Sequence, residues 1–268
     1  MGASRTAIEQ ANSRGDAALL GYLPLGFPSV ERSVTAAKIL VDTGFDVIEL
    51  GFPYSDPAMD GPVIQEATTL ALQQGTHLTD LLRATEEISN YGTSVVSMTY
   101  WNPVHWYGTA AFARDFASAG GAGLITPDLP PEEAGEWIAA SDELGLERVF
   151  LSAPSSSPHR LRLISEASNG WVYAASTMGV TGARATLDTS AKTLAERTYD
   201  AGAKVVCVGI GVSTGAQARE VASFANGVII GSALVRPLLD LPWEQAKVAM
   251  GVKASELATG VAGRWSGR

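Results

Sequence analysis

Glu49 has the position in this sequence that is best suited to proton transfer. It lies in the apolar run VIELG at 47–51, which has the composition of a buried strand and places the carboxyl group near the end of that strand. Burial disfavours the charged form of a carboxyl group and raises its pKa into the range useful for general acid–base catalysis. The alternative is a structural role, in which Glu49 pairs with a neighbouring Lys or Arg.

Two further carboxylates, Asp56 and Asp60, follow on the segment 51–61, just before Pro62. Asp before a helix is commonly a cap or a turn former, and Pro62 is typical of the first helical turn. A second carboxylate near Glu49 could instead divide the work of an acid and a base with it. The position alone leaves both interpretations open.

Glycines form a second group of residues with a chemical use. GIG at 209–211 and GS at 231–232 each follow a predicted strand directly. Glycine lets the backbone approach a ligand closely, and backbone N–H groups can bind phosphate oxygens. The sequence therefore predicts a phosphate site, although glycines can also simply turn a chain. The small, polar segment 176–185 predicts a lid that excludes water, or else a plain connection.

The elements that must position these residues alternate between strands and helices. Runs rich in Val, Ile and Tyr precede turn residues and helical periodicity. We predict strands at 18–23, 46–50, 94–99, 123–126, 148–151, 171–174, 204–208 and 227–230. Helices are predicted at 30–43, 109–119, 131–144, 158–167, 187–201, 214–224 and 243–261. Eight such units favour a closed barrel over an open doubly wound sheet.

The predicted fold class is therefore α/β, a single TIM (β/α)8 barrel over residues 1–268. It has an extra N-terminal helix and long loops after strands 2 and 6. Catalytic groups of such barrels lie at the C-terminal ends of the strands, and phosphate commonly binds after strands 7 and 8. Glu49 and both glycine groups fall at these places.

Composition excludes several other classes of protein. A content of 46% hydrophobic and 18% charged residues predicts a globular chain. The net charge of −9 argues against nucleic acid and anionic membranes as partners. Cys207 has no second cysteine to pair with, and the three histidines lack metal-ligand spacing. With no signal or membrane segment in view, we predict a cytoplasmic protein without a metal.

Seven segments together resemble the tryptophan synthase α chain family. They are YLPLGFP at 22–28, ELGFPYSDP at 49–57 with DGP at 60–62, YWNP at 100–103, DLP at 128–130, GVTG at 179–182, GIG at 209–211 and GS at 231–232. The segment with Glu49 and the downstream DGP is highly specific. The resemblance implies retro-aldol cleavage of indole-3-glycerol phosphate to indole and glyceraldehyde 3-phosphate.

The resemblance also assigns roles to individual residues. Glu49 would be the general acid–base at indole C3 and at the glycerol hydroxyl, Asp60 would stabilise charge on the indole N–H, and Tyr173 would assist. Thr181 on the lid would hold Asp60. The indole slot would be lined by Tyr22, Ile64, Tyr100 and Ile125. The phosphate would be surrounded by Gly182, Gly209, Ile210, Gly211, Gly231 and Ser232.

The implied partner is the tryptophan synthase β chain, which carries pyridoxal phosphate (PLP), while this chain holds no cofactor. Indole is small and apolar, so a partner that consumes it in place is favoured. We expect the contact on the C-terminal rim, where apolar and aromatic side chains gather. The expected contact residues are Pro53, Asp56, Pro57, Asn102, Pro103 and Val104. The alternative is that these side chains pack back onto the barrel.

The sequence departs from the family pattern at Phe27, Tyr54 and Thr177, which affects contacts of the rim and lid but not Glu49 or Asp60. Two other functions remain as alternatives. One is another phosphate-binding barrel enzyme acting on a related indole or anthranilate phosphate. The other is a non-catalytic barrel that only activates a partner.

Overall fold

The structure, a computed structural model, describes residues 2–175, 189–209 and 211–265. In these ranges the strands are β1 (Ala18–Pro24), β2 (Val47–Gly51), β3 (Ser94–Met98), β4 (Gly121–Ile125), β5 (Glu147–Val149), β6 (Leu151–Ser152), β7 (Val172–Ala175), β8 (Val206–Gly209) and β9 (Gly227–Ile230). Each of the eight predicted strands is present, but the one predicted at 148–151 is divided into β5 and β6 at Phe150.

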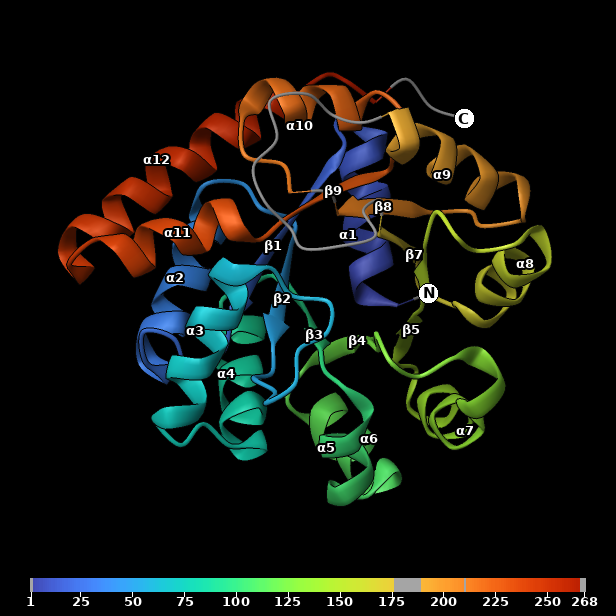
Figure 1. The fold of residues 1–268 in the computed structure, drawn as a ribbon, viewed down its shortest axis with the longest axis horizontal. Coiled ribbons are helices and arrows are strands. Elements are labelled where there is room, and N and C mark those ends of the chain that lie inside the picture. The colour runs from blue at the N-terminus through green and yellow to red at the C-terminus, as the bar shows by residue number, and fades with distance from the viewer. Residues whose placement is uncertain (1, 176–188, 210, 266–268) are drawn as a thin grey trace.

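Helices surround these strands on the outside (Figure 1). They are α1 (Ala3–Ser13), α2 (Val30–Asp42), α3 (Pro62–Gln73), α4 (Leu78–Asn90), α5 (Trp101–Tyr107), α6 (Thr109–Ser118), α7 (Gly135–Leu144), α8 (Pro158–Ala167), α9 (Thr189–Asp200), α10 (Gly215–Ala222), α11 (Ser232–Asp240) and α12 (Trp243–Val261), with the 3-10 helix η1 (Pro131–Glu133). In the part of the chain that the structure describes, no helix is long and apolar enough to cross a membrane.

The strands form a closed parallel barrel. Their hydrogen-bonded order is β5-β4-β3-β2-β1-β9-β8-β7-β6, and every pairing is parallel. β5 and β6 lie at the two ends of this order but are consecutive in the chain, and the Phe150 carbonyl between them accepts from Tyr173 N at 3.0 Å. The segment 147–152 thus joins the two ends of the order, which confirms the barrel and excludes the open sheet.

The alternation of side chains along each strand sets which residues face the barrel interior. In β2, Val47 belongs to the cluster that fills the interior, whereas Ile48 and Leu50 pack in the layer between strands and helices. Because side chains alternate with period 2, Glu49 faces inward above Val47. The strand pattern therefore directs the carboxyl group into the mouth of the barrel.

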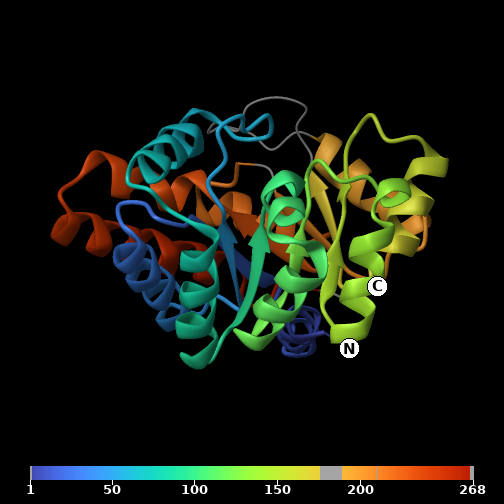
Figure 2. The same cartoon turned by 90° about the horizontal axis from the view of Figure 1, so that it is seen from below.

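The N-terminal helix covers the opposite end. α1 contacts β1, β2, β3 and β4, and Figure 2 shows it at one end of the barrel with the segment 52–61 at the other. The buried Glu147 accepts hydrogen bonds from the Ser4 hydroxyl and, at 3.0 Å, from Arg5 N. The Trp171 indole N–H donates to the same Ser4 hydroxyl at 3.0 Å. This end is closed, so the chemistry is confined to the mouth.

Candidate active site

A cavity of about 460 Å³ opens at the mouth of the barrel. Its walls come from the C-terminal ends of the strands and from the segments that follow them. The lining residues are Tyr22, Glu49, Ala58, Met59, Asp60, Ile64, Met98, Leu151, Ala153, Tyr173, Ala175, Gly209, Gly211, Ile229, Gly231 and Ser232. The cavity brings both predicted catalytic carboxylates and Tyr173 to one surface.

Glu49 is fully buried at this surface, and neither of its carboxylate oxygens has a hydrogen-bond partner among the described residues. The alternative of an ion pair at the rim is therefore not seen in that part of the chain. Burial, with a smaller effect from the charge of Asp60, raises the pKa of Glu49 to about 8. Glu49 is thus predominantly protonated at neutral pH and can donate a proton.

Asp60 lies on the segment between β2 and α3 and is only partly buried. The N-cap residue of α3 is Gly61, so Asp60 does not occupy the N-cap position considered for it. Burial raises the pKa of Asp60 to about 6. At pH 7 the site therefore holds a mostly ionised Asp60 beside a mostly neutral Glu49, the division of labour expected of two catalytic carboxyl groups.

Two tyrosine hydroxyls flank the carboxyl groups, and each lies against a glycine. A Cβ on Gly51 would overlap the Tyr22 hydroxyl, and a Cβ on Gly209 would overlap that of Tyr173. Burial is the main cause that raises the pKa of both hydroxyls, and the nearby carboxylates add to it. Both phenols therefore keep their protons and can serve as hydrogen-bond donors at the mouth.

The other side of the cavity has the features of a site that binds an anion through neutral groups. Gly209 is the last residue of β8, Gly211 lies two residues beyond it, and Gly231 and Ser232 lie at the start of α11. None of the described residues that line the cavity is Lys or Arg, and the first turn of α11 has no acidic residue. Backbone N–H groups and a helix N-terminus are suited to a phosphate at such a place.

Several predicted site residues lie elsewhere. Ile125 is fully buried in the barrel interior, and Tyr100 contacts the segment 52–61; neither is among the residues that line the cavity. Thr181, Gly182 and Ile210 fall outside the described residues, as does the departure at Thr177. The role of each stays a prediction.

Sequence reasoning missed several apolar residues of the cavity wall. These are Ala58, Met59, Met98, Leu151, Ala153, Ala175 and Ile229. Four of these residues lie within the last two positions of their strands, namely Met98 in β3, Leu151 in β6, Ala175 in β7 and Ile229 in β9. A strand end that faces inward is the signal that could have identified them, because that is where a barrel builds its site.

The expected partner contacts divide into exposed and buried residues. Asp56 and Asn102 are exposed, and Pro57 and Pro103 are partly exposed. Val104 is 0% exposed and Pro53 is also buried, so these two side chains pack onto the barrel as in the alternative. The reason at Val104 is helical: α5 turns Val104 toward the core and Trp106, which is 81% exposed, toward solvent.

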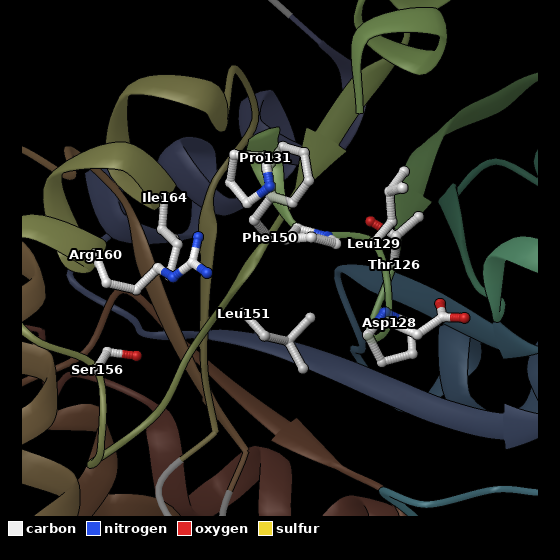
Figure 3. A pocket seen from close by; sticks show the side chains of 11 residues that line it. Thr126, Asp128, Leu129, Pro131, Phe150, Leu151, Ser156, Arg160 and Ile164 are labelled. Atoms are coloured by element: carbon white, nitrogen blue, oxygen red, sulfur yellow. The ribbon is translucent and has the colours of Figure 1, made fainter. Parts of the chain in front are cut away.

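A second cavity of about 240 Å³ lies beside the first and shares Leu151 with it (Figure 3). Its charged side chains stand on opposite sides and both have partners. Asp128 accepts from Trp101 N at 2.9 Å, and Arg160 pairs with Glu132 at 2.5 Å. These contacts are structural, so the carboxyl groups of the first cavity remain the better candidates for catalysis.

Comparisons with known proteins identify the family of this chain. A family model described as tryptophan synthase alpha chain matches residues 8–261. The tryptophan synthase alpha chain of Leifsonia xyli is 53% identical over 260 residues, which cover 96% of this chain and 98% of that one. A structure of Mycobacterium tuberculosis tryptophan synthase superposes with a TM-score of 0.90 at 51% identity, covering 96% of both chains. The alpha subunit from Legionella pneumophila gives 0.88 at 31% identity, covering 97% of this chain and 98% of that chain. This chain belongs to the tryptophan synthase α chain family.

Proposed function

We propose that Glu49 carries the proton transfers, and Asp60 the charge stabilisation, in the cleavage of indole-3-glycerol phosphate. The chain is a lyase whose products are indole and glyceraldehyde 3-phosphate, the α reaction of tryptophan synthase. One observation supports the residue assignment above all others. Glu49 is fully buried, has no hydrogen-bond partner among the described residues, and faces the same cavity as Asp60.

The bond to be broken joins indole C3 to the first carbon of the glycerol phosphate. Addition of a proton to C3 places positive charge on the ring nitrogen. Removal of the proton from the hydroxyl on this first glycerol carbon then forms the aldehyde there as the bond to C3 breaks, and the bonding electrons return to the ring to restore aromatic indole. Each step moves one proton, so a single carboxyl group that first donates and then accepts ends in its starting state.

The raised pKa values suit these roles. A protonated Glu49 donates to C3 and, once ionised, accepts the hydroxyl proton, while the anionic Asp60 faces the positive indole N–H. The hydroxyl of Tyr173 lies at the same mouth, over Gly209, where it can donate to a substrate oxygen. We assign the phosphate group to the neutral donors at 209–211 and 231–232, with Gly182 of the lid.

Tyr22 and Ile64 line the cavity together with Met98, which supports their place around the indole ring. We further propose that the chain holds no cofactor, because the indole ring itself accepts the electrons of the broken bond. PLP would be held by the partner β chain, where indole condenses with serine. We place the barrel, as one domain over residues 1–268, in the cytoplasm, in keeping with the biosynthetic reaction and with Cys207 as the one cysteine of the sequence.

Steady-state indole formation by the isolated chain tests the assignment. Glu49→Gln should lower kcat by at least the ~10²–10⁴ typical of a general acid–base group, because the amide can neither donate nor accept the proton. Glu66→Gln, at an exposed position on α3, is the matched control and should leave kcat unchanged. A Glu49→Gln variant that keeps more than about a tenth of the wild-type kcat would contradict the proposal.

A further inference from the structure

The middle of the segment 52–61, which carries Asp60, contacts the barrel through the aromatic side chain of Tyr100. The Tyr100 hydroxyl accepts a hydrogen bond from Met59 N at 3.1 Å. The Tyr100 ring also stacks on Tyr54, with ring centroids 4.5 Å apart and an interplanar angle of 14°. Tyr100 therefore contacts this segment both near its start and at the residue directly before Asp60.

Three of the four residues between these two contacts are exposed. Ser55, Asp56 and Ala58 are exposed, and the Ser55 hydroxyl bonds only locally, to Asp56 at 2.7 Å. The other attachments lie at the two ends: Phe52 N donates to the Met98 carbonyl at 2.9 Å, and the side chain of Gln65 donates to the Asp60 carbonyl at 2.9 Å. The Tyr100 contacts thus hold the part of the segment that the ends leave unsupported.

Tyr100 is itself held firmly. It is the N-cap residue of α5, and the next residue, Trp101, donates its N–H to both oxygens of Asp128 at 2.9 and 3.1 Å. Figure 3 shows the Asp128 carboxyl group turned away from the side of the small cavity that holds Arg160. The Trp101 ring packs against the buried Trp137 at 6.3 Å between centroids. Tyr100 therefore directly precedes a helix that is fixed to the barrel by the contacts of Trp101.

The same helix presents its outer face to solvent. Asn102, His105 and Trp106 are exposed on α5, while Val104 is buried on the inner face. A displacement of α5 by a molecule bound to this outer face would move Tyr100 with it. Since Met59 is bonded to Tyr100 and precedes Asp60 directly, the carboxyl group would be displaced as well.

We propose that Tyr100 is a positioning residue that fixes Asp60 in the cavity through Met59 and Tyr54, and that it links Asp60 to the outer face of α5. This inference rests on the proposed function, because it gives Tyr100 its importance through the role of Asp60. The Tyr100 hydroxyl acts on the backbone of the segment and not on the substrate. It is distinct from the hydroxyls of Tyr22 and Tyr173, which face the cavity.

The test compares Tyr100→Phe with Tyr54→Phe in the isolated full-length chain. Both variants keep the stacked rings, but only Tyr100→Phe removes the acceptor of the Met59 N–H. The structure shows no hydrogen bond of the Tyr54 hydroxyl among the described residues, which makes Tyr54→Phe the matched control. The readouts are kcat/KM for indole-3-glycerol phosphate over pH and the unfolding temperature.

Tyr100→Phe should lower kcat/KM by about three- to tenfold, the equivalent of one lost hydrogen bond that orders the segment. Because a less ordered Asp60 is better hydrated, the acidic limb of the pH profile should move to lower pH, a change that a loss of stability would not produce. Added β chain should raise the rate of Tyr100→Phe by a smaller factor than that of wild type. Tyr54→Phe should match wild type in all three respects.

A Tyr100→Phe variant with the wild-type acidic limb and kcat/KM would overturn the positioning role. An unchanged limb with a lowered unfolding temperature would likewise overturn it and assign Tyr100 to stability alone. The Glu49→Gln result separates this failure from a failure of the proposed function. If Glu49→Gln is inactive while Tyr100→Phe behaves as Tyr54→Phe, only the positioning role is lost.

Discussion

At the scale of single residues, the site is built by burial and not by pairing. Glu49 has no Lys or Arg as a hydrogen-bond partner among the described residues, and desolvation is the largest cause of its raised pKa. Keeping a carboxyl group in this state makes the folded chain bind a proton that the unfolded chain releases at neutral pH. The burial that keeps Glu49 protonated therefore lowers the free energy of unfolding by an amount that depends on pH.

The direction of that dependence follows from the pKa of about 8 in the folded chain and the ordinary value of 4.5. The contribution of Glu49 to the free energy of unfolding is fully present below about pH 4.5 and is lost as the pH rises toward about 8. At pH 7 the loss is on the order of 3 kcal/mol. Glu49→Gln cannot ionise, so its unfolding temperature relative to wild type should rise between pH 5 and pH 8.

Thermal unfolding at a series of pH values measures this difference, with Glu66→Gln as the control that should follow wild type throughout. Parallel curves for Glu49→Gln and wild type would mean that Glu49 ionises freely in the folded chain. In that case another group would have to supply the proton to indole C3.

At the scale of elements, the strands could be predicted from sequence because their pattern is local. The run at 47–51 alternates between the interior cluster and the outer layer, and this places Glu49 at the mouth without knowledge of any other strand. The break at Phe150 could not be predicted, since it depends on pairing with β4 on one side and β7 on the other. The same holds for Val104, whose burial depends on how α5 docks.

The positions of the two glycine groups, 209–211 and 231–232, could be predicted for a similar reason, because each lies at or just after the end of a strand. Their role in phosphate binding stays a prediction. The structure adds that Gly211 has a φ of +68°, a backbone conformation that residues other than glycine rarely adopt. Gly211→Val should therefore raise KM for indole-3-glycerol phosphate by about tenfold or more, since one lost charge-assisted hydrogen bond is worth about 1.5–3 kcal/mol.

Backbone strain at Gly211 could lower activity by itself, so a second glycine serves as the control. Gly202 has φ of +105°, has open space around its Cβ position, and lies before β8 at the opposite end of the barrel from the cavity. Gly202→Val should strain the chain and lower the unfolding temperature with no effect on KM. Equal KM values for the two variants would place the phosphate elsewhere.

At the scale of the whole molecule, one end of the barrel is closed and the other opens into the cavity. α1 covers the closed end through Glu147 and Ser4, while the segment 52–61 and α5 lie together at the mouth. The partner is the tryptophan synthase β chain. A partner at the mouth would meet Trp106, the most exposed large apolar side chain among the described residues.

The contact face can be tested by placing negative charge on the outer face of α5. Asn102→Asp with Trp106→Asp puts two carboxylates on the outer face of α5, where a partner would have to desolvate them, so the complex should weaken by at least tenfold in Kd. Val104 is unsuitable for this purpose because it is 0% exposed, and a carboxylate there would disrupt the core. Val252→Asp is the control, at a side chain 68% exposed on α12.

Binding of the β chain and the rate of indole formation should then change together. We expect docking on α5 and on the segment of Asp56 to favour the conformation in which Asp60 faces the cavity, so wild type should be activated by the partner. The double variant should lose that activation but keep the basal rate of the isolated chain, because neither residue lines the cavity. If binding and activation both survive the two substitutions while Val252→Asp impairs them, the β chain docks over α12 and the coupling through α5 is wrong.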